Sequence, residues 1–189
     1  MKYYTRALTP NDKVKAEISM SPTDRIAVIG HNGWAARSII RALASQPFTQ
    51  PVRVLAREGS NTDALLDNTE VARYSWEDER SIRNALEGVD VLLYFIPPFR
   101  FRPFQLMRNS SFIGHDGISD QKKLIPHVKD AKIKLFAPSD LALPYTAEER
   151  RDVQVPREKL GLEHALDEAG IPFVTICIGN MTSFALDSP

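Results

Sequence analysis

The residues with the clearest chemical meaning are Gly30, Gly33 and Ala36, which stand at the spacing G-x-x-G-x-x-A between an apolar run and a helical pattern. Gly30 would permit a tight turn, Gly33 would let the backbone approach a pyrophosphate, and the small Ala36 would let the following helix lie close to the strand. The phosphate charge would then meet the N-terminus of that helix. The spacing therefore predicts a dinucleotide-binding turn, with a tight turn in a non-binding domain as the alternative. The other loop residues assigned to this binding site are His31, Asn32 and Trp34.

A second chemical signal is Arg57, which follows the apolar run VRVLA at the place where dinucleotide-binding folds meet the adenosine ribose. An acidic residue at this place binds the ribose 2′-hydroxyl, whereas an arginine can pair with a 2′-phosphate. Arg57 therefore favours NADP over NAD as the cofactor. Ser60 would add a hydroxyl to the same phosphate. The alternatives are a solvated arginine beside Glu58 and an ordinary turn serine.

The charge balance of the chain limits its partners. Its 24 Lys and Arg residues match 24 Asp and Glu residues, so it lacks the basic excess that nucleic acid or an anionic membrane would need. The segment PPFRFRPF at 97–104 mixes aromatic and basic residues, and we expect it to form a loop near the cofactor or a packed turn. Binding of nucleic acid is the less favoured alternative there.

Cysteine and histidine usage limits metal and redox chemistry. Cys177 is the only cysteine in the sequence, which excludes an intrachain disulfide, and the four histidines are too scattered for a zinc site. No apolar run has the length of a membrane span, and the N-terminal residues lack a signal-peptide pattern. We therefore expect a cytoplasmic protein that binds no metal, nucleic acid or membrane.

The pattern of apolar residues predicts the strands and helices that position these residues. From Arg25 onward, short apolar runs alternate with helical patterns, which is typical of parallel crossover units. We expect an N-terminal extension over 1–24 and a Rossmann-like α/β domain over 25–189, with a doubly wound parallel sheet. The expected strands are 25–30, 52–56, 70–74, 89–96, 133–140 and 171–180. The expected helices are 33–45, one between an N-cap at Asp78 and a terminating Gly88, 120–131 with an interruption near Pro126, and 157–169, and residues 97–117 are expected to form a long connection.

The order of these segments resembles the NmrA-like and isoflavone-reductase-like group of atypical short-chain dehydrogenases. The resemblance covers most of residues 25–185 and implies a Rossmann fold, NADP(H) binding and either reductase activity or redox sensing. It places the glycine-rich turn on the family's phosphate loop and Arg57 on its phosphate-binding arginine. The segments that carry it are IAVIGHNGWAARSIIRAL, VRVLARE, EVARYSWEDERSIRNALEGVDVLLYFI, IKLFAPSD and KLGLEHALDEAGIPFVTICIGN.

The resemblance also assigns two catalytic candidates. Lys159 falls on the family's active-site lysine, and Ser139 lies where short-chain dehydrogenases often carry an active-site hydroxyl. Lys159 shares a helix face with Leu162 and Leu166, so its ammonium would point along the sheet toward a nicotinamide ribose and polarise a reacting group. The alternative is a surface lysine paired with Glu163.

Parts of the family pattern are missing. Val155 stands four residues before Lys159, in the place of the usual catalytic tyrosine, and Tyr145 is the nearest substitute for that proton donor. The family's acidic, aromatic and glycine turn is replaced by DLA at 140–142. This replacement puts the geometry of the substrate side in question.

The length of the chain adds one more expectation. Family members continue past the sixth strand with segments that shape the substrate pocket, whereas this chain ends at Pro189. We therefore expect a short or missing substrate-binding part, and weak activity unless a partner subunit covers the cleft. The first hypothesis is an NADP(H)-dependent oxidoreductase acting on a small organic molecule such as a secondary metabolite. The alternative is a non-catalytic NADP-sensing module that binds a regulatory protein partner.

Overall fold

The computed structural model describes residues 21–65, 67–95, 115–139 and 145–176. Five parallel strands form one sheet in the order β3-β2-β1-β4-β5, which confirms the predicted doubly wound α/β fold. The strands are β1 (Ile26–Ile29), β2 (Val52–Arg57), β3 (Thr69–Tyr74), β4 (Val91–Tyr94) and β5 (Leu135–Ala137). The helices are α1 (Trp34–Ala44), α2 (Glu79–Leu86), α3 (His115–Asp130), α4 (Ala147–Asp152) and α5 (Gln154–Ala169).

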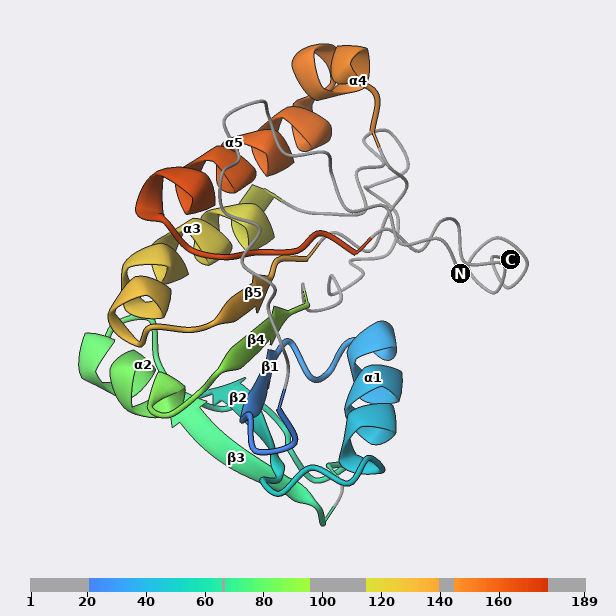
Figure 1. Ribbon diagram of the computed structural model, residues 1–189, viewed down its shortest axis with the longest axis vertical. Coiled ribbons are helices and arrows are strands. Elements are labelled where there is room, and N and C mark those ends of the chain that lie inside the picture. The colour runs from blue at the N-terminus through green and yellow to red at the C-terminus, as the bar shows by residue number, and fades with distance from the viewer. Residues whose placement is uncertain (1–20, 66, 96–114, 140–144, 177–189) are drawn as a thin grey trace.

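Helices cover both faces of the sheet (Figure 1). On one face lies α1, whose Ala36 belongs to the same buried cluster as Val28 of β1. On the other face lie α2, α3 and α5, over a larger core that includes Ile82, Leu124, Leu166 and Phe136. Successive strand residues point to opposite faces, so β1 sends Val28 to the first core and Ala27 and Ile29 to the second. All of β1 is therefore buried, as expected for a continuous apolar run.

Strand β1 lies where the strand order reverses. From β1 the chain crosses through α1 to β2 and β3 on one side, and it returns through α2 to β4 on the other. In register, Val28 lies opposite Val54 of β2 and Leu93 of β4. The connections that follow β1 and β4 therefore diverge, which opens a crevice at the carboxyl edge of the sheet where such folds bind ligands.

The ends of α2 follow local signals in the sequence. Asp78 is its N-cap, and the Asp78 carboxylate accepts a hydrogen bond from the Arg80 N–H at 3.0 Å. Gly88 follows the helix with φ of 67°, a left-handed conformation that glycine adopts without a Cβ clash. Both predicted boundary residues are confirmed.

The predicted interruption at Pro126 is wrong, because α3 continues through it to Asp130. A proline removes one N–H from the helical ladder and normally kinks or ends a helix. Leu124 and Val128 flank it, are each 1% exposed and belong to the larger core. Their burial outweighs the missing hydrogen bond. The helix also takes the last residues of the expected connection, whose residues 97–114 lie outside the described part of the chain.

The predicted sixth strand is not formed over its described residues, 171–176. Phe173 makes only an isolated parallel bridge with Phe136 of β5, and the Phe136 N–H donates to the Pro172 carbonyl at 2.9 Å. Two features limit the pairing: β5 is only three residues long, and Pro172 has no N–H to donate. Residues 177–180, which include Cys177, lie outside the described residues.

Lys134 ties together the amino-terminal edge of the sheet. Its Nζ lies 2.7 Å from Asp24 Oδ1 and 2.9 Å from Asp90 Oδ1. The other oxygen of Asp90 accepts a hydrogen bond from the Arg25 N–H at 2.9 Å. Asp24, which the sequence assigns to the extension, is only 3% exposed. Asp24, the last residue of the expected extension, therefore packs against the sheet.

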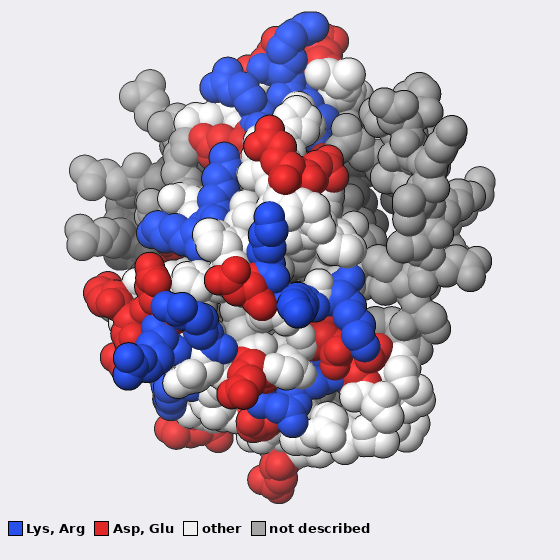
Figure 2. Space-filling model, turned by 60° about the vertical axis from the view of Figure 1, so that its left-hand side comes forward, with Lys and Arg blue, Asp and Glu red and all other residues white. Residues whose placement is uncertain are grey.

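The surface carries both signs of charge. Figure 2 shows Lys and Arg side chains interspersed with Asp and Glu over the face in view, with no continuous basic patch on that face. None of the helices in the described ranges is long and apolar enough to cross a membrane.

Candidate functional site

The turn between β1 and α1 depends on Gly30. Its φ is 87°, and a Cβ added there would lie 1.8 Å from the carbonyl oxygen of Phe95, in the chain that follows β4. The Gly33 N–H donates to the Gly30 carbonyl at 3.0 Å, and Gly33 is the N-cap of α1. The N-terminus of α1, whose first N–H groups have no partner within the helix, is thereby held at the carboxyl edge of β1.

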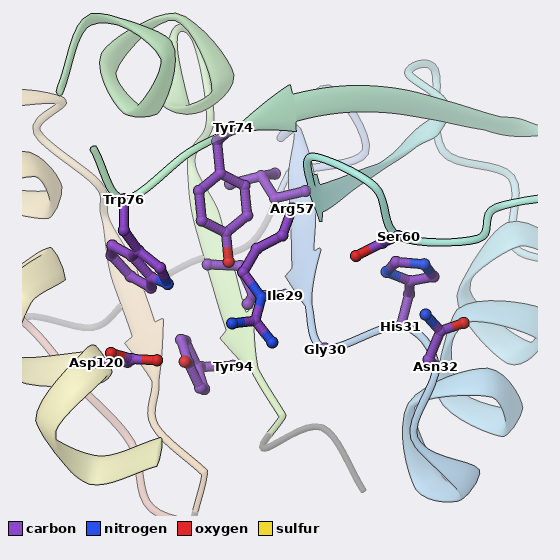
Figure 3. Close-up of a pocket in the computed structure, with 11 residues that line it drawn as sticks. Ile29, Gly30, His31, Asn32, Arg57, Ser60, Tyr74, Trp76, Tyr94 and Asp120 are labelled. Carbon is purple, nitrogen blue, oxygen red and sulfur yellow. The ribbon is translucent and has the colours of Figure 1, made fainter. Parts of the chain in front are cut away.

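A pocket opens beside this turn (Figure 3). Its walls come from the carboxyl ends of β1, β2, β3 and β4 and from α3. The predicted site residues that it brings together are Gly30, His31, Asn32, Arg57 and Ser60. The aromatic and charged lining residues that sequence reasoning missed are Tyr74, Trp76, Tyr94 and Asp120, and the aliphatic Ile29 and Leu55 complete the lining.

Three other predicted cofactor-binding residues are not in this lining. Gly33 is buried at the start of α1, and Ala36 is fully buried between α1 and the sheet. Trp34 is the first residue of α1, and its side chain lies outside the described residues. Gly33 therefore shapes the backbone turn, and Ala36 allows the helix to pack closely on the sheet.

Arg57, the last residue of β2, extends its side chain into the pocket (Figure 3). No residue in the described part of the chain forms an ion pair or a side-chain hydrogen bond with its guanidinium, Glu58 included. The sequence placed this arginine at the end of a strand. The structure adds that its charge faces a hollow lined by aromatic rings.

Tyr74 and Tyr94 end strands β3 and β4, and each is 3% exposed. Burial raises the pKa of Tyr74 to about 12, and the nearby Arg57 charge opposes part of that rise. Burial raises the pKa of Tyr94 further, and Tyr74 adds to the rise. Both phenols are therefore neutral at physiological pH and can donate or accept a hydrogen bond. No motif in the sequence signals them, since each is only a strand-terminal aromatic residue.

Trp76 and Asp120 close the far side of the pocket (Figure 3). The rings of Trp76 and Tyr74 meet edge to face, with centroids 5.4 Å apart. Lys123 Nζ lies 5.7 Å from the Trp76 ring centroid and 2.9 Å from Asp120 Oδ1. The indole Nε1 of Trp76 is buried and has no hydrogen-bond partner among the described residues.

Lys159 lies in α5 and does not line this pocket. It is 3% exposed, and its Nζ lies 5.2 Å from the centroid of the Tyr145 ring. This burial contradicts the alternative of a surface lysine. Tyr145, the substitute proton donor considered from the sequence, therefore contacts the ammonium through its ring face.

Ser139 follows β5 and is half-buried. Its N–H donates to Gln121 Oε1 at 2.8 Å, and Gln121, which is fully buried in α3, donates from Nε2 to the Gly117 carbonyl at 3.2 Å. Neither Ser139 nor Lys159 is part of the pocket lining. The described residues thus bring together five of the predicted cofactor-binding residues but do not place the two catalytic candidates in the same cavity. Residues 140–142, the altered turn, lie outside the described residues.

The described residues contain no group of three or more His, Cys, Asp or Glu side chains arranged to hold a metal ion. A doubly wound parallel sheet with a glycine turn and a pocket at its carboxyl edge defines a Rossmann-like protein. The sequence model of the NmrA-like family matches residues 22–187, so the chain belongs to the NmrA-like family. This match confirms the family resemblance that the sequence motifs indicate.

Solved structures share the fold. AtPrR2 with NADP+ and (+)-pinoresinol has a TM-score of 0.66 and 22% identity, over 87% of this chain and 53% of that one. Triphenylmethane reductase from Citrobacter sp., complexed with NADP(H), has a TM-score of 0.60 and 21% identity, over 85% of this chain and 51% of that one. An NADPH-dependent quinone oxidoreductase from Escherichia coli has a TM-score of 0.63 and 20% identity, over 86% of this chain and 50% of that one. The chain thus spans about half the length of these solved structures. No curated protein matches the sequence.

Proposed function

We propose that this chain binds NADP(H) and forms the cofactor-binding part of an oxidoreductase that acts on a small organic molecule. The observation that carries the proposal is Arg57, whose guanidinium enters a pocket beside the glycine turn and is neutralised by no described residue. A cation close to the N-terminus of α1 suits a ligand with several phosphates. The solved structures above, two with NADP+ or NADP(H) and one NADPH-dependent, support this choice of cofactor.

The residues of the pocket fit the parts of such a dinucleotide. The turn at Gly30 and the N-terminus of α1 would hold the pyrophosphate, and Arg57 and Ser60 would hold the 2′-phosphate. The aromatic wall formed by Tyr74, Trp76 and Tyr94 suits the adenine ring, because a flat base packs against aromatic side chains. NADP(H) supplies or accepts a hydride when bound, which no side chain does by itself.

Lys159 and Ser139 are the residues we propose for the substrate side. The Lys159 ammonium would hold the ribose hydroxyls and stabilise negative charge that develops on the substrate. The Ser139 hydroxyl would orient a carbonyl or enone oxygen. Lys159 is buried, which keeps its ammonium away from bulk water, where its interaction with a developing charge would be weakest.

The test of cofactor binding is a fluorescence titration with NADPH and NADH. A charge-assisted hydrogen bond contributes about 1.5–3 kcal/mol, so NADPH should bind about ten- to a hundredfold more tightly. Arg57→Ala should abolish this preference. The matched control is Arg83→Ala, which removes an exposed arginine on α2. Equal affinities of the wild-type chain for the two cofactors would contradict the proposal.

A second function, NADP sensing, is favoured by Val155, which is half-buried in the place of the usual catalytic tyrosine. Loss of NADPH absorbance with a panel of quinones, carbonyls and enones separates the two functions. In an enzyme, Lys159→Met should lower turnover about a hundredfold with less effect on NADPH affinity, because the ammonium acts mainly in the transition state. In a sensor, no substrate is reduced, and a pull-down with and without NADP identifies a protein partner whose binding depends on the nucleotide.

A further inference from the structure

The loop that follows β2 has a defined shape. The Ser60 N–H donates to the Arg57 carbonyl at 3.0 Å, which closes a four-residue turn. Gly59 has φ of 74° at the third position, as a type II turn requires. A Cβ at Gly59 would meet nothing within 4 Å, so this glycine is needed for its backbone angle and not for space.

Arg73 of β3 clamps this loop from the neighbouring strand. Its Nη1 donates to the Ser60 carbonyl at 2.7 Å and to the Arg57 carbonyl at 3.3 Å. Its Nη2 donates to Thr62 Oγ1 at 2.9 Å. In the β2–β3 register Arg73 lies opposite Ala56, the residue just before Arg57, where the turn begins. Its side chain is therefore next to the turn that it contacts. The planar guanidinium therefore fixes three acceptors of one short loop together.

His31 holds the same loop from the glycine turn. Its Nε2 lies within hydrogen-bond distance of the Asn61 carbonyl oxygen, at 3.0 Å, and the residue is 5% exposed. The loop is thus ordered on both sides before a ligand binds. Preorganisation of this kind raises affinity, because the loop loses little conformational entropy on binding.

We propose that Arg73 is the positioning residue that makes this chain select nucleotides with a 2′-phosphate. The inference rests on the proposed NADP(H) binding. By engaging the carbonyls of Arg57 and Ser60, Arg73 holds their backbone while both side chains face the pocket (Figure 3). Its own charge lies beside the same loop and adds to the positive potential that a phosphate dianion meets.

The experiment compares two ligand pairs by calorimetric titration: NADPH with NADH, and adenosine 2′,5′-bisphosphate with adenosine 5′-monophosphate. The wild-type chain should prefer the 2′-phosphorylated member of each pair. Arg73→Gln should reduce that preference about tenfold. The melting temperature should stay close to that of the wild type, because the Arg73 side chain is exposed. Arg83→Gln on α2, an exposed arginine in an i,i+4 pair, is the matched control and should keep the preference.

Arg73→Lys separates positioning from charge. It keeps the positive charge but cannot engage three acceptors through a planar fork, so it should also lose preference for the 2′-phosphate. Full preference in Arg73→Lys, or equal weakening of both members of each pair in Arg73→Gln, would overturn the role of Arg73. A wild-type chain without any preference would instead refute the proposed function, and this inference would fall with it. The wild-type titration therefore distinguishes the two failures.

Discussion

The guanidinium of Arg150 donates two hydrogen bonds to the carboxylate of Glu163, at 2.9 and 3.0 Å. The pair joins α4 to α5 one helical turn after Lys159. The Arg150 side chain is 20% exposed and that of Glu163 is 4% exposed, so both groups have lost most of their hydration. Nη1 of Arg150 bridges both carboxylate oxygens, and this charge-assisted contact compensates for that loss and fixes the two helices against each other.

Removal of this arginine should destabilise the fold. Arg150→Met removes the cation that bridges both oxygens of the buried Glu163 carboxylate, and the free energy of unfolding should fall by about 3 kcal/mol. Urea denaturation followed by circular dichroism measures the change. Arg83→Met is the control, because its pair with Glu79 is exposed and should contribute less than about 1 kcal/mol. Equal losses in the two variants would show that Glu163 does not depend on Arg150.

Two glycines with similar backbone angles should respond very differently to alanine. Gly59→Ala introduces left-handed strain alone, which costs about 1–2 kcal/mol, since a Cβ there meets nothing within 4 Å. Gly30→Ala adds a clash with the Phe95 carbonyl, which belongs to the chain that pairs with β1 through the Phe95 N–H and the Ile29 carbonyl. We expect thermal melts to show a modest shift for Gly59→Ala and a much larger one, or no folded protein, for Gly30→Ala. Similar melting temperatures would mean that the turn can rearrange.

The buried tyrosines predict a loss of stability in alkali. The pKa of Tyr74 is raised by burial to about 12, against 10.0 for an ordinary tyrosine. Between these values the unfolded chain releases a proton that the folded chain retains, so the stabilisation is complete below about pH 10 and declines as pH rises toward 12. Chemical denaturation at neutral pH and at about pH 11 measures the decline. In Tyr74→Phe the free energy of unfolding should fall less between neutral pH and about pH 11 than in the wild type. An equal fall in both would show that other groups cause the loss of stability.

The ion pairs of Lys134 with Asp24 and Asp90 predict a loss of stability in acid. The hydrogen bond from Lys134 lowers the pKa of Asp24 below its ordinary value of 3.8. The stabilisation is therefore present above that value and is lost as pH falls through the lower pKa of the folded state. Lys134→Met should reduce stability at neutral pH and flatten the acid decline in urea midpoints. Parallel acid profiles for wild type and variant would exclude this pair as a source of acid sensitivity.

The spacing of residues in the sequence was enough to predict the features that depend on residues close together in the chain. The glycine turn follows from the places of Gly30 and Gly33 between a strand and a helix, and the ends of α2 follow from Asp78 and Gly88. Continuous apolar runs indicated strands covered on both faces, because central parallel strands have no solvent side. The place of Arg57 at the end of its strand also followed from the order of the elements.

The pocket wall could not be predicted in this way. Tyr74 lies opposite Arg57 in the β2–β3 register, and Tyr94 lies opposite Ile29 in the β1–β4 register. Such pairs join residues that are distant in sequence, and their alignment depends on which strands become neighbours and in what register. Arg73 was missed for the same reason, since its acceptors belong to the loop after another strand.

Two features differ from what local sequence preference predicts. Helix α3 continues through Pro126, and Phe173 forms only an isolated bridge. Proline's local preference predicts a break, and an apolar run predicts a strand, but burial of Leu124 and Val128 and the shortness of β5 decide otherwise. The sequence by itself determined the fold class, the family and the glycine turn after β1, because these depend on periodicity and short-range spacing. Only the tertiary structure decided which aromatic and charged side chains face Arg57, because long-range strand pairing and core packing place them there.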